Sequence, residues 1–207
     1  MSVVRLALVS TMSIQSIATA STVTLSAIAP LVAAAIGMPS SFIGTYVCFI
    51  YIGAAFAAVA GGTMVTRYGG IHVSQGCLIL AAIGLMLSAV ANFWCICLGG
   101  LLLGLSYGPI TPASSDILAH TVPKERMGFV FSLKQTAVPL GSALAGFIVP
   151  SVALWANNWQ AGPHVMAIFA LSVALLVLYH RSSLDDHFDP RSRFSIHTVL
   201  NALRLVT

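Results

Sequence analysis

Charged residues are scarce in this sequence of 207 residues, of which Asp, Glu, Lys and Arg together make up 7%. A soluble domain contains about 25%, and so few charges cannot cover the surface of a water-soluble globule. Hydrophobic residues make up 58%, and the mean hydropathy is +0.96, which also excludes an intrinsically disordered chain. The composition therefore predicts an integral membrane protein.

Acidic residues are fewer still, with five Asp and Glu against nine Lys and Arg, so the formal net charge is +4. A basic balance can indicate nucleic-acid binding, which needs Lys and Arg gathered on one face. Here the basic residues are scattered between long apolar runs. We therefore interpret them as marks of membrane topology and predict no nucleic-acid partner.

Cysteine pairs and ligand clusters are also missing from the sequence. Cys48, Cys77, Cys95 and Cys97 lie in or beside apolar runs and form no pair of C-x-x-C motifs, so we predict that they are packing thiols. The sequence contains no cluster of metal-ligating residues and no glycine-rich phosphate loop. It thus predicts no metal site and no cofactor.

Long apolar runs are what the sequence has in abundance. A bilayer core about 30 Å thick needs about 20 helical residues, whereas a membrane β-barrel would show short alternating segments. The runs of about this length are 6–28, 42–65, 73–93, 95–115, 128–149 and 163–179. They predict an all-α membrane protein with six transmembrane helices. A signal peptide is the alternative for the first run, because Ala18 and Ala20 form a small-x-small pattern behind Arg5.

The basic residues all fall on one side of these six spans. Each lies before the first span, after the second, after the fourth or just inside the fifth, or after the sixth. They are Arg5, Arg67, Lys124, Arg126, Lys134, Arg181, Arg191, Arg193 and Arg204. By the positive-inside rule both termini are predicted to be cytoplasmic, and we expect the inner membrane of a bacterium. Trp94, Trp155 and Trp159 lie at span ends on the opposite side.

We predict two three-helix repeats, about 1–116 and 117–181, with their boundary placed at the connection 116–127, the longest internal connection on the cytoplasmic side. The run Gly44–Gly61 resembles Gly128–Gly146 in a span of opposite direction, which is typical of an inverted repeat. The connections after the first, third and fifth spans are short, so we expect consecutive spans to be antiparallel neighbours.

The composition changes after the sixth span. Residues 182–207 are predicted to form a cytoplasmic linker, because charged residues become frequent there. Within it, Ile196, Val199, Leu200 and Leu203 have the spacing of an amphipathic helix, which we expect to lie on the inner membrane face.

Polar side chains follow one face of the first span. At 100° per residue they fall within about 80° of one another, as a water-filled path would require. They are Thr11, Gln15, Thr19, Thr22 and Ser26. The alternative is that the hydroxyls only bond carbonyls of their own helix, which does not account for Gln15. We predict that Gln15, Thr19 and Thr22 bind substrate.

The fourth span combines a glycine face with two prolines. Gly100, Gly104 and Gly108 recur every four residues, a spacing that allows another helix to pack closely. Pro109 and Pro112 follow and should bend the helix by removing backbone hydrogen bonds.

Tyr107 and Thr111 lie near one face of this bend and could reach a ligand. Alternatively, Tyr107 is hydrogen-bonded and locks two helices together.

Lys134 is the only charged residue well inside a span. Its long side chain could snorkel to the membrane interface. Alternatively, it faces a central cavity and favours an anionic substrate, in which case Gln135, Pro139 and Ser142 would line the same wall.

The run Gly104–Gly108 also matches the G-x-S-x-G motif of serine hydrolases, with Ser106 at its centre. That motif requires a strand before the serine and a helix after it, whereas Ser106 lies in the middle of a span. An intramembrane serine hydrolase would pair Ser106 with a histidine of the sixth span, but His164 and His180 lie near its ends. No catalytic residue is predicted.

The run Gly62–Gly70 between the second and third spans resembles the signature G-x-x-x-D-R-x-G-R of the major facilitator superfamily. Gly62, Arg67 and Gly69 match, while Thr66 replaces the usual Asp and Gly70 the final basic residue. The runs 104–115 and 134–141 are similar to the fourth and fifth helices of the same family.

The resemblance implies the amino-terminal six-helix half of a twelve-helix transporter. Gly62, Arg67 and Gly69 would then belong to an inner gate, and the polar stripe of the first span, with Tyr107 and Lys134, to one wall of a substrate cavity. The implied partners are the lipid bilayer, a small-molecule substrate and a second six-helix half, from the same chain or another. The alternative is a truncated bundle that transports nothing.

Overall fold

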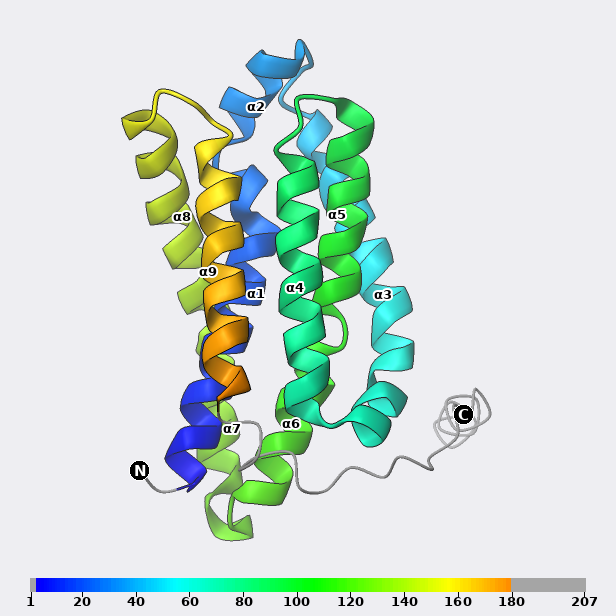
Figure 1. The fold of residues 1–207 in the computed structure, drawn as a ribbon, viewed down its shortest axis with the longest axis vertical. Helices are drawn as coiled ribbons and strands as arrows, with labels where there is room; N and C mark the ends of the chain where they lie inside the picture. The colour runs from blue at the N-terminus through cyan, green and yellow to red at the C-terminus, as the bar shows by residue number, and fades with distance from the viewer. Residues whose placement is uncertain (1–2, 180–207) are drawn as a thin grey trace.

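The computed structural model describes residues 3–179, and every regular element in that range is a helix (Figure 1). Six helical stretches are long and apolar enough to span a membrane, so the predicted fold class and number of spans are confirmed. The predicted linker 182–207 and its amphipathic helix lie outside the described residues.

Four of the six stretches are single helices: α1 (Val3–Ala27), α3 (Phe42–Tyr68), α4 (Gly70–Ser88) and α9 (Ala161–Leu178). The other two are interrupted. The fourth consists of α5 (Phe93–Tyr107) and α6 (Ile110–Thr121), and the fifth of the short η1 (Lys124–Arg126), α7 (Met127–Gln135) and α8 (Ala137–Trp155).

Prolines account for both interruptions. A proline lacks an N–H group, and its ring clashes with the carbonyl four residues earlier. For Pro109 that carbonyl belongs to Leu105, and α5 ends two residues after it. For Pro139 it belongs to Gln135, where α7 ends. The sequence predicted the bend at Pro109 but not the break before Pro139.

The connection after the first span is longer than expected, because it contains the helix α2 (Ala29–Ile36). Pro30 lies in the first turn of α2, where a missing N–H costs nothing. The same proline cannot continue α1, which ends at Ala27. Gly37 closes α2 with a positive φ of 66°, and α3 begins at Phe42. The expected short connection was therefore wrong here.

The helices pack in pairs that a two-fold operation would exchange. Helix α1 lies along α8 and α9, while α5 lies along α3 and α4, and α4 and α9 pack on each other. Exchanging α1 with α5, α3 with α8, and α4 with α9 reproduces the same set of neighbours. This pairing divides the chain between α4 and α5, with three spans on each side. The predicted boundaries of 1–116 and 117–181, which leave four spans before the division, stay a prediction.

Glycines allow the closest of these contacts. A methyl group added to Gly104 would overlap the carbonyl oxygen of Ile50, and one added to Gly108 would lie 2.6 Å from the carbonyl oxygen of Ala54. Gly100 lies similarly against Tyr46. The three glycines predicted to form a packing face thus all lie against α3.

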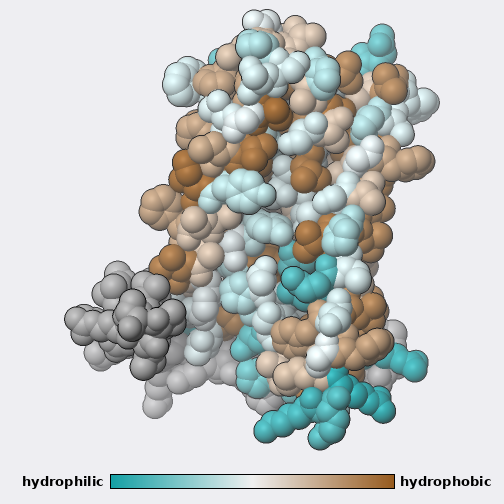
Figure 2. All heavy atoms as spheres, turned by 180° about the vertical axis from the view of Figure 1, so that it is seen from behind, coloured by the Kyte–Doolittle hydropathy of each residue, from teal (hydrophilic) through white to brown (hydrophobic). Residues whose placement is uncertain are grey.

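Basic and aromatic residues separate to opposite ends of the bundle. Arg5 in the first turn of α1, Arg67 in the last turn of α3, and η1 lie at the lower end in Figure 1. The first turn of α5, which contains Trp94, and the loop that carries Trp159 lie at the upper end. Seen from behind, the most hydrophilic atoms gather at the lower end, while hydrophobic and weakly polar atoms alternate over the middle (Figure 2).

Candidate functional site

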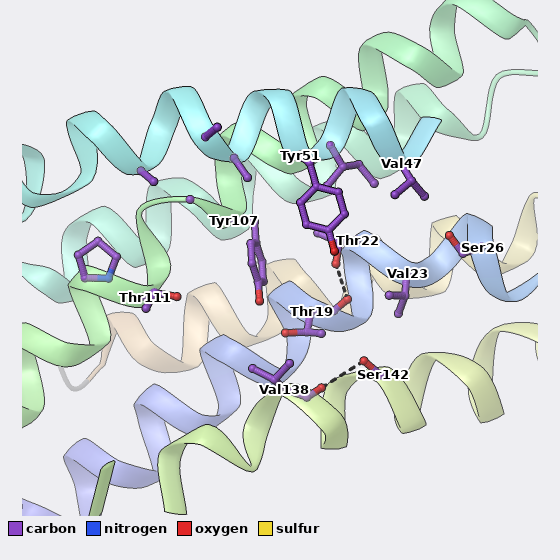
Figure 3. Close-up of a pocket in the computed structure, with 16 residues that line it drawn as sticks. Thr19, Thr22, Val23, Ser26, Val47, Tyr51, Tyr107, Thr111, Val138 and Ser142 are labelled. Atoms are coloured by element: carbon purple, nitrogen blue, oxygen red, sulfur yellow. Dashed lines mark hydrogen bonds between the residues drawn. The ribbon is translucent and has the colours of Figure 1, made fainter. Parts of the chain in front are cut away.

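A cleft of about 670 Å³ lies among α1, α3, α8 and the junction between α5 and α6. Its labelled side chains come from all of these elements and converge on one space (Figure 3). The lining residues are Thr19, Thr22, Val23, Ser26, Val47, Ile50, Tyr51, Ala54, Ala55, Ala58, Tyr107, Gly108, Thr111, Pro112, Val138 and Ser142. The cleft is within the size range of small-molecule sites.

The lining combines apolar side chains with hydroxyl groups and, among residues 3–179, contains no charged residue. Thr19 donates to the carbonyl of Gln15 at 2.9 Å, and Thr22 to the carbonyl of Thr19 at 2.8 Å. Ser142 donates to Val138 at 3.3 Å (Figure 3). Each of these hydroxyls has used its hydrogen within its own helix, so its oxygen remains available to accept a hydrogen bond from a ligand.

Gln15 connects α1 to the cleft through Tyr107. Its Nε2 donates to the Tyr107 hydroxyl at 3.4 Å, and its side chain is only 1% exposed. Its Oε1 is buried and has no hydrogen-bond partner among residues 3–179. Such an unmatched buried acceptor is uncommon and calls for an explanation.

Lys134 lies inside the bundle rather than at its end, because its residue is only 2% exposed. It shares a buried stripe of α7 and α8 with Val130, Ala137, Gly141 and Ala145. This stripe faces α1, since the Ser16 hydroxyl donates to the Ala137 carbonyl at 3.0 Å. Snorkelling to the interface does not describe this placement.

No acidic side chain in the described part of the chain pairs with Lys134. The Asp116 carboxylate lies 3.6 Å from His120 Nδ1, both on α6. Glu125, the other acidic residue of residues 3–179, is exposed in η1. A buried cation without a counter-ion is costly in a membrane and is a functional-site candidate for that reason.

Four of the seven residues predicted to bind substrate line the cleft, namely Thr19, Thr22, Tyr107 and Thr111. Gln15 lies one turn below Thr19, behind Tyr107. Lys134 and Gln135 are not part of the lining: Lys134 turns toward α1, and Gln135 is exposed where α7 ends.

Sequence reasoning missed Tyr51, whose ring lies across the cleft from Thr22 in Figure 3. A signal was present, because Tyr51 shares a helical face with Ala54, Ala55 and Ala58. Alanine side chains are small, so a helix face made mostly of alanine leaves room for a cleft next to its one aromatic residue.

The three residues assigned to an inner gate lie at the lower end of α3. Gly69 has a φ of 88° and donates its N–H to Val65 at 2.8 Å, which turns the chain into α4. The Arg67 guanidinium lies 5.3 Å from the centre of the Tyr68 ring. Gly62 is exposed and lines a second hollow of about 450 Å³ with Thr66 and Asp116.

Ser106 is buried in α5, and its hydroxyl donates to the Leu103 carbonyl at 2.7 Å. No histidine bonds Ser106 within residues 3–179, and His164 lies in the first turn of α9. His180 lies outside the described residues.

Comparisons with known proteins agree with this fold. The structure is similar to the in meso crystal structure of the POT family transporter PepTSo, with a TM-score of 0.74 and 16% sequence identity. The similarity covers 96% of this chain and 41% of that one, so the chain spans less than half the length of that transporter. No match was found among curated protein sequences.

The sequence itself matches the Major Facilitator Superfamily over residues 11–205. This range includes the predicted signature at Gly62, Arg67 and Gly69 and every helix that lines the cleft. Proteins of this superfamily are membrane transporters and typically not enzymes. The chain belongs to the Major Facilitator Superfamily, with a six-helix fold that corresponds to about half of one of its transporters.

Proposed function

We propose that the chain is the amino-terminal half of a secondary transporter and moves a small solute across the membrane by alternating access. The observation that carries this proposal is the cleft, which is walled by α1, α3, α6 and α8 of one six-helix unit. A second six-helix unit, from the same longer chain or from another chain, would supply the opposite wall.

The surfaces beside the cleft support a second unit. On α3 the exposed residues include Gly44, Ala55 and Gly62, and on α8 they include Ser142 and Gly146. Nothing lies within 4 Å of a methyl group added to any of the three glycines. Small residues let membrane helices approach closely. The same two helices also expose Phe56 and Phe147, so the small residues alternate with large apolar side chains on these surfaces.

In this mechanism the two six-helix units pack against each other in two alternative arrangements, one open to each side of the membrane. Bound solute shifts the balance only if it binds one packing more tightly than the other, and any coupled ion gradient acts in the same way. Gly62, Arg67 and Gly69 would belong to the gate that closes the cytoplasmic side. We assign an organic anion as the solute, because Lys134 is a buried cation without a described counter-ion.

Cysteine labelling tests alternating access. In a background without the native cysteines, Ser26→Cys and Thr111→Cys should both react with a membrane-impermeant maleimide from either side of the membrane, because both residues line the cleft. Leu175→Cys on the exposed face of α9 is the control and should react from neither side. Reaction of each cleft position from one side only would favour the alternative, a truncated bundle that does not transport.

Tag accessibility tests the orientation. The basic ends of α1, α3 and η1 lie together, and the positive-inside rule then puts both termini in the cytoplasm, which we propose is that of a bacterium. Protease should therefore remove tags at either terminus only from inverted vesicles. Tags that are cut on opposite sides would contradict both the six-span topology and the transporter assignment.

A further inference from the structure

We propose that the cleft and Lys134 together form a two-part site for a monocarboxylate with an apolar or aromatic body and no cationic group. This inference rests on the proposed function and narrows its substrate class. The cleft would hold the body of the solute, and the polar groups beneath its floor would hold the carboxylate.

The first step is the position of Lys134 relative to the cleft. Val138 lines the cleft, and Lys134 precedes it by four residues, across the break between α7 and α8. Gln15 lies one turn before Thr19, which also lines the cleft. The Ser16–Ala137 hydrogen bond holds these two segments side by side. Lys134 and Gln15 therefore lie at similar depth, just below the floor.

The second step is the hydrogen-bonding capacity of these groups. The Tyr107 hydroxyl accepts from Gln15 Nε2, so its own hydrogen remains free to donate. The Lys134 ammonium has three hydrogens and no described acceptor, and Gln15 Oε1 is an acceptor without a donor. A carboxylate bound here would accept one hydrogen bond from the Tyr107 hydroxyl and one from the Lys134 ammonium. The ammonium would then lie beside Gln15 and could also donate to Gln15 Oε1.

The third step is the charge balance. One ammonium group matches one carboxylate, and in the described part of the chain no second cation lines the cleft for a dianion. No acidic side chain of residues 3–179 lines the cleft either, so the ammonium group of an amino acid would lose its hydration without gaining a partner there. The site therefore favours a solute with a single negative charge over zwitterions and bases.

The fourth step is the character of the cleft itself. Val23, Val47, Ile50 and the rings of Tyr51 and Tyr107 form most of its wall. Apolar and aromatic walls with a few placed polar groups are typical of sites that bury most of a small ligand. A phenyl or alkyl group attached to the carboxylate satisfies this requirement.

Binding of three matched probes to the purified full chain in lipid nanodiscs tests the inference by calorimetry. The probes are 4-phenylbutyrate, its neutral analogue 4-phenylbutanamide and its zwitterionic analogue 2-amino-4-phenylbutyrate. We expect 4-phenylbutyrate to bind at least about 30-fold more tightly than the other two, as loss of one partner of a buried charge pair implies. Equal affinity for the acid and the amide, or binding of neither, would overturn the proposal.

Variants then assign the effect to Lys134. Lys134→Met should reduce the affinity for 4-phenylbutyrate to that for the amide, whereas Lys134→Arg should retain acid selectivity. Lys124→Met, which removes an exposed cation in η1, is the matched control and should bind as the unmodified chain does. Acid selectivity that survives in Lys134→Met would also overturn the proposal.

The binding experiment and the cysteine-labelling experiment can fail independently, so failure of the substrate class is distinguishable from failure of the proposed function. If Ser26→Cys and Thr111→Cys react from both sides but the acid is not preferred, only the substrate class is wrong. If the acid is preferred but each cysteine reacts from one side only, the chain has the binding site without alternating access.

Discussion

Replacement of Gly104 by valine is expected to destabilise the bundle by about 3 kcal/mol or more, at or above the upper end of the usual cost of overpacking. Any side chain at this position meets the backbone of α3 at the Ile50 carbonyl and the Ala54 nitrogen. Those atoms belong to a helix of 27 residues and cannot move aside individually. The helices α3 and α5 would have to separate along their length.

Denaturant unfolding in mild detergent measures this effect, together with the yield of monodisperse protein. The matched control is Gly76→Val, because Gly76 is exposed on α4 and an added methyl group has nothing within 4 Å. Its stability should change by less than about 0.5 kcal/mol, as for other exposed substitutions. Equal losses in the two variants would mean that valine is harmful at any membrane position and that the α3–α5 contact is not responsible.

Lys134→Met is expected to have the opposite effect and to stabilise the unliganded chain by about 2–3 kcal/mol. Insertion scales assign about 2.5–3.5 kcal/mol to a lysine at the centre of a membrane helix. Lys134 lies in α7, nearer the basic end of its span, so we expect a cost toward the lower end of this range. Its residue is only 2% exposed and has no described counter-ion, and methionine has similar length and fills irregular spaces well.

The midpoint of denaturant unfolding, measured without ligand, checks this result. Lys124→Met removes an exposed charge and should leave the midpoint unchanged. A less stable Lys134→Met variant would show that the ammonium group is bonded in the unliganded chain, which contradicts an uncompensated cation. Greater stability combined with loss of acid binding would identify Lys134 as a residue whose cost is retained for function.

The residues of the cleft show how far sequence reasoning could reach. Thr19 and Thr22 were predicted from the polar stripe of α1, because a polar face on a membrane helix must point away from lipid. Gln15 belongs to the same stripe, yet it lies beneath the cleft and bonds Tyr107. The angular position of a residue on its helix does not specify how deep its side chain lies in the bundle or which side chain it bonds. Both depend on the neighbouring helix that packs against that face.

Tyr51 and the break before Pro139 show a second limit. Tyr51 became a lining residue because α3 packs on α5 through glycines and leaves its alanine face open. The break at Thr136 lies where the Pro139 ring would meet the Gln135 carbonyl. The sequence contained the proline, but the same residue type at Pro150 lies inside α8 without ending it.

By itself, the sequence determined the membrane class, the six spans and the family signature at Gly62, Arg67 and Gly69, because hydropathy and a short motif are properties of neighbouring residues along the chain. Only the tertiary structure decided that Lys134 is buried toward α1, that Gln15 lies behind Tyr107, and that a cleft opens among four helices. The physical reason is that the surroundings of a side chain are set by helices distant in sequence, and their closest approach depends on which glycines meet.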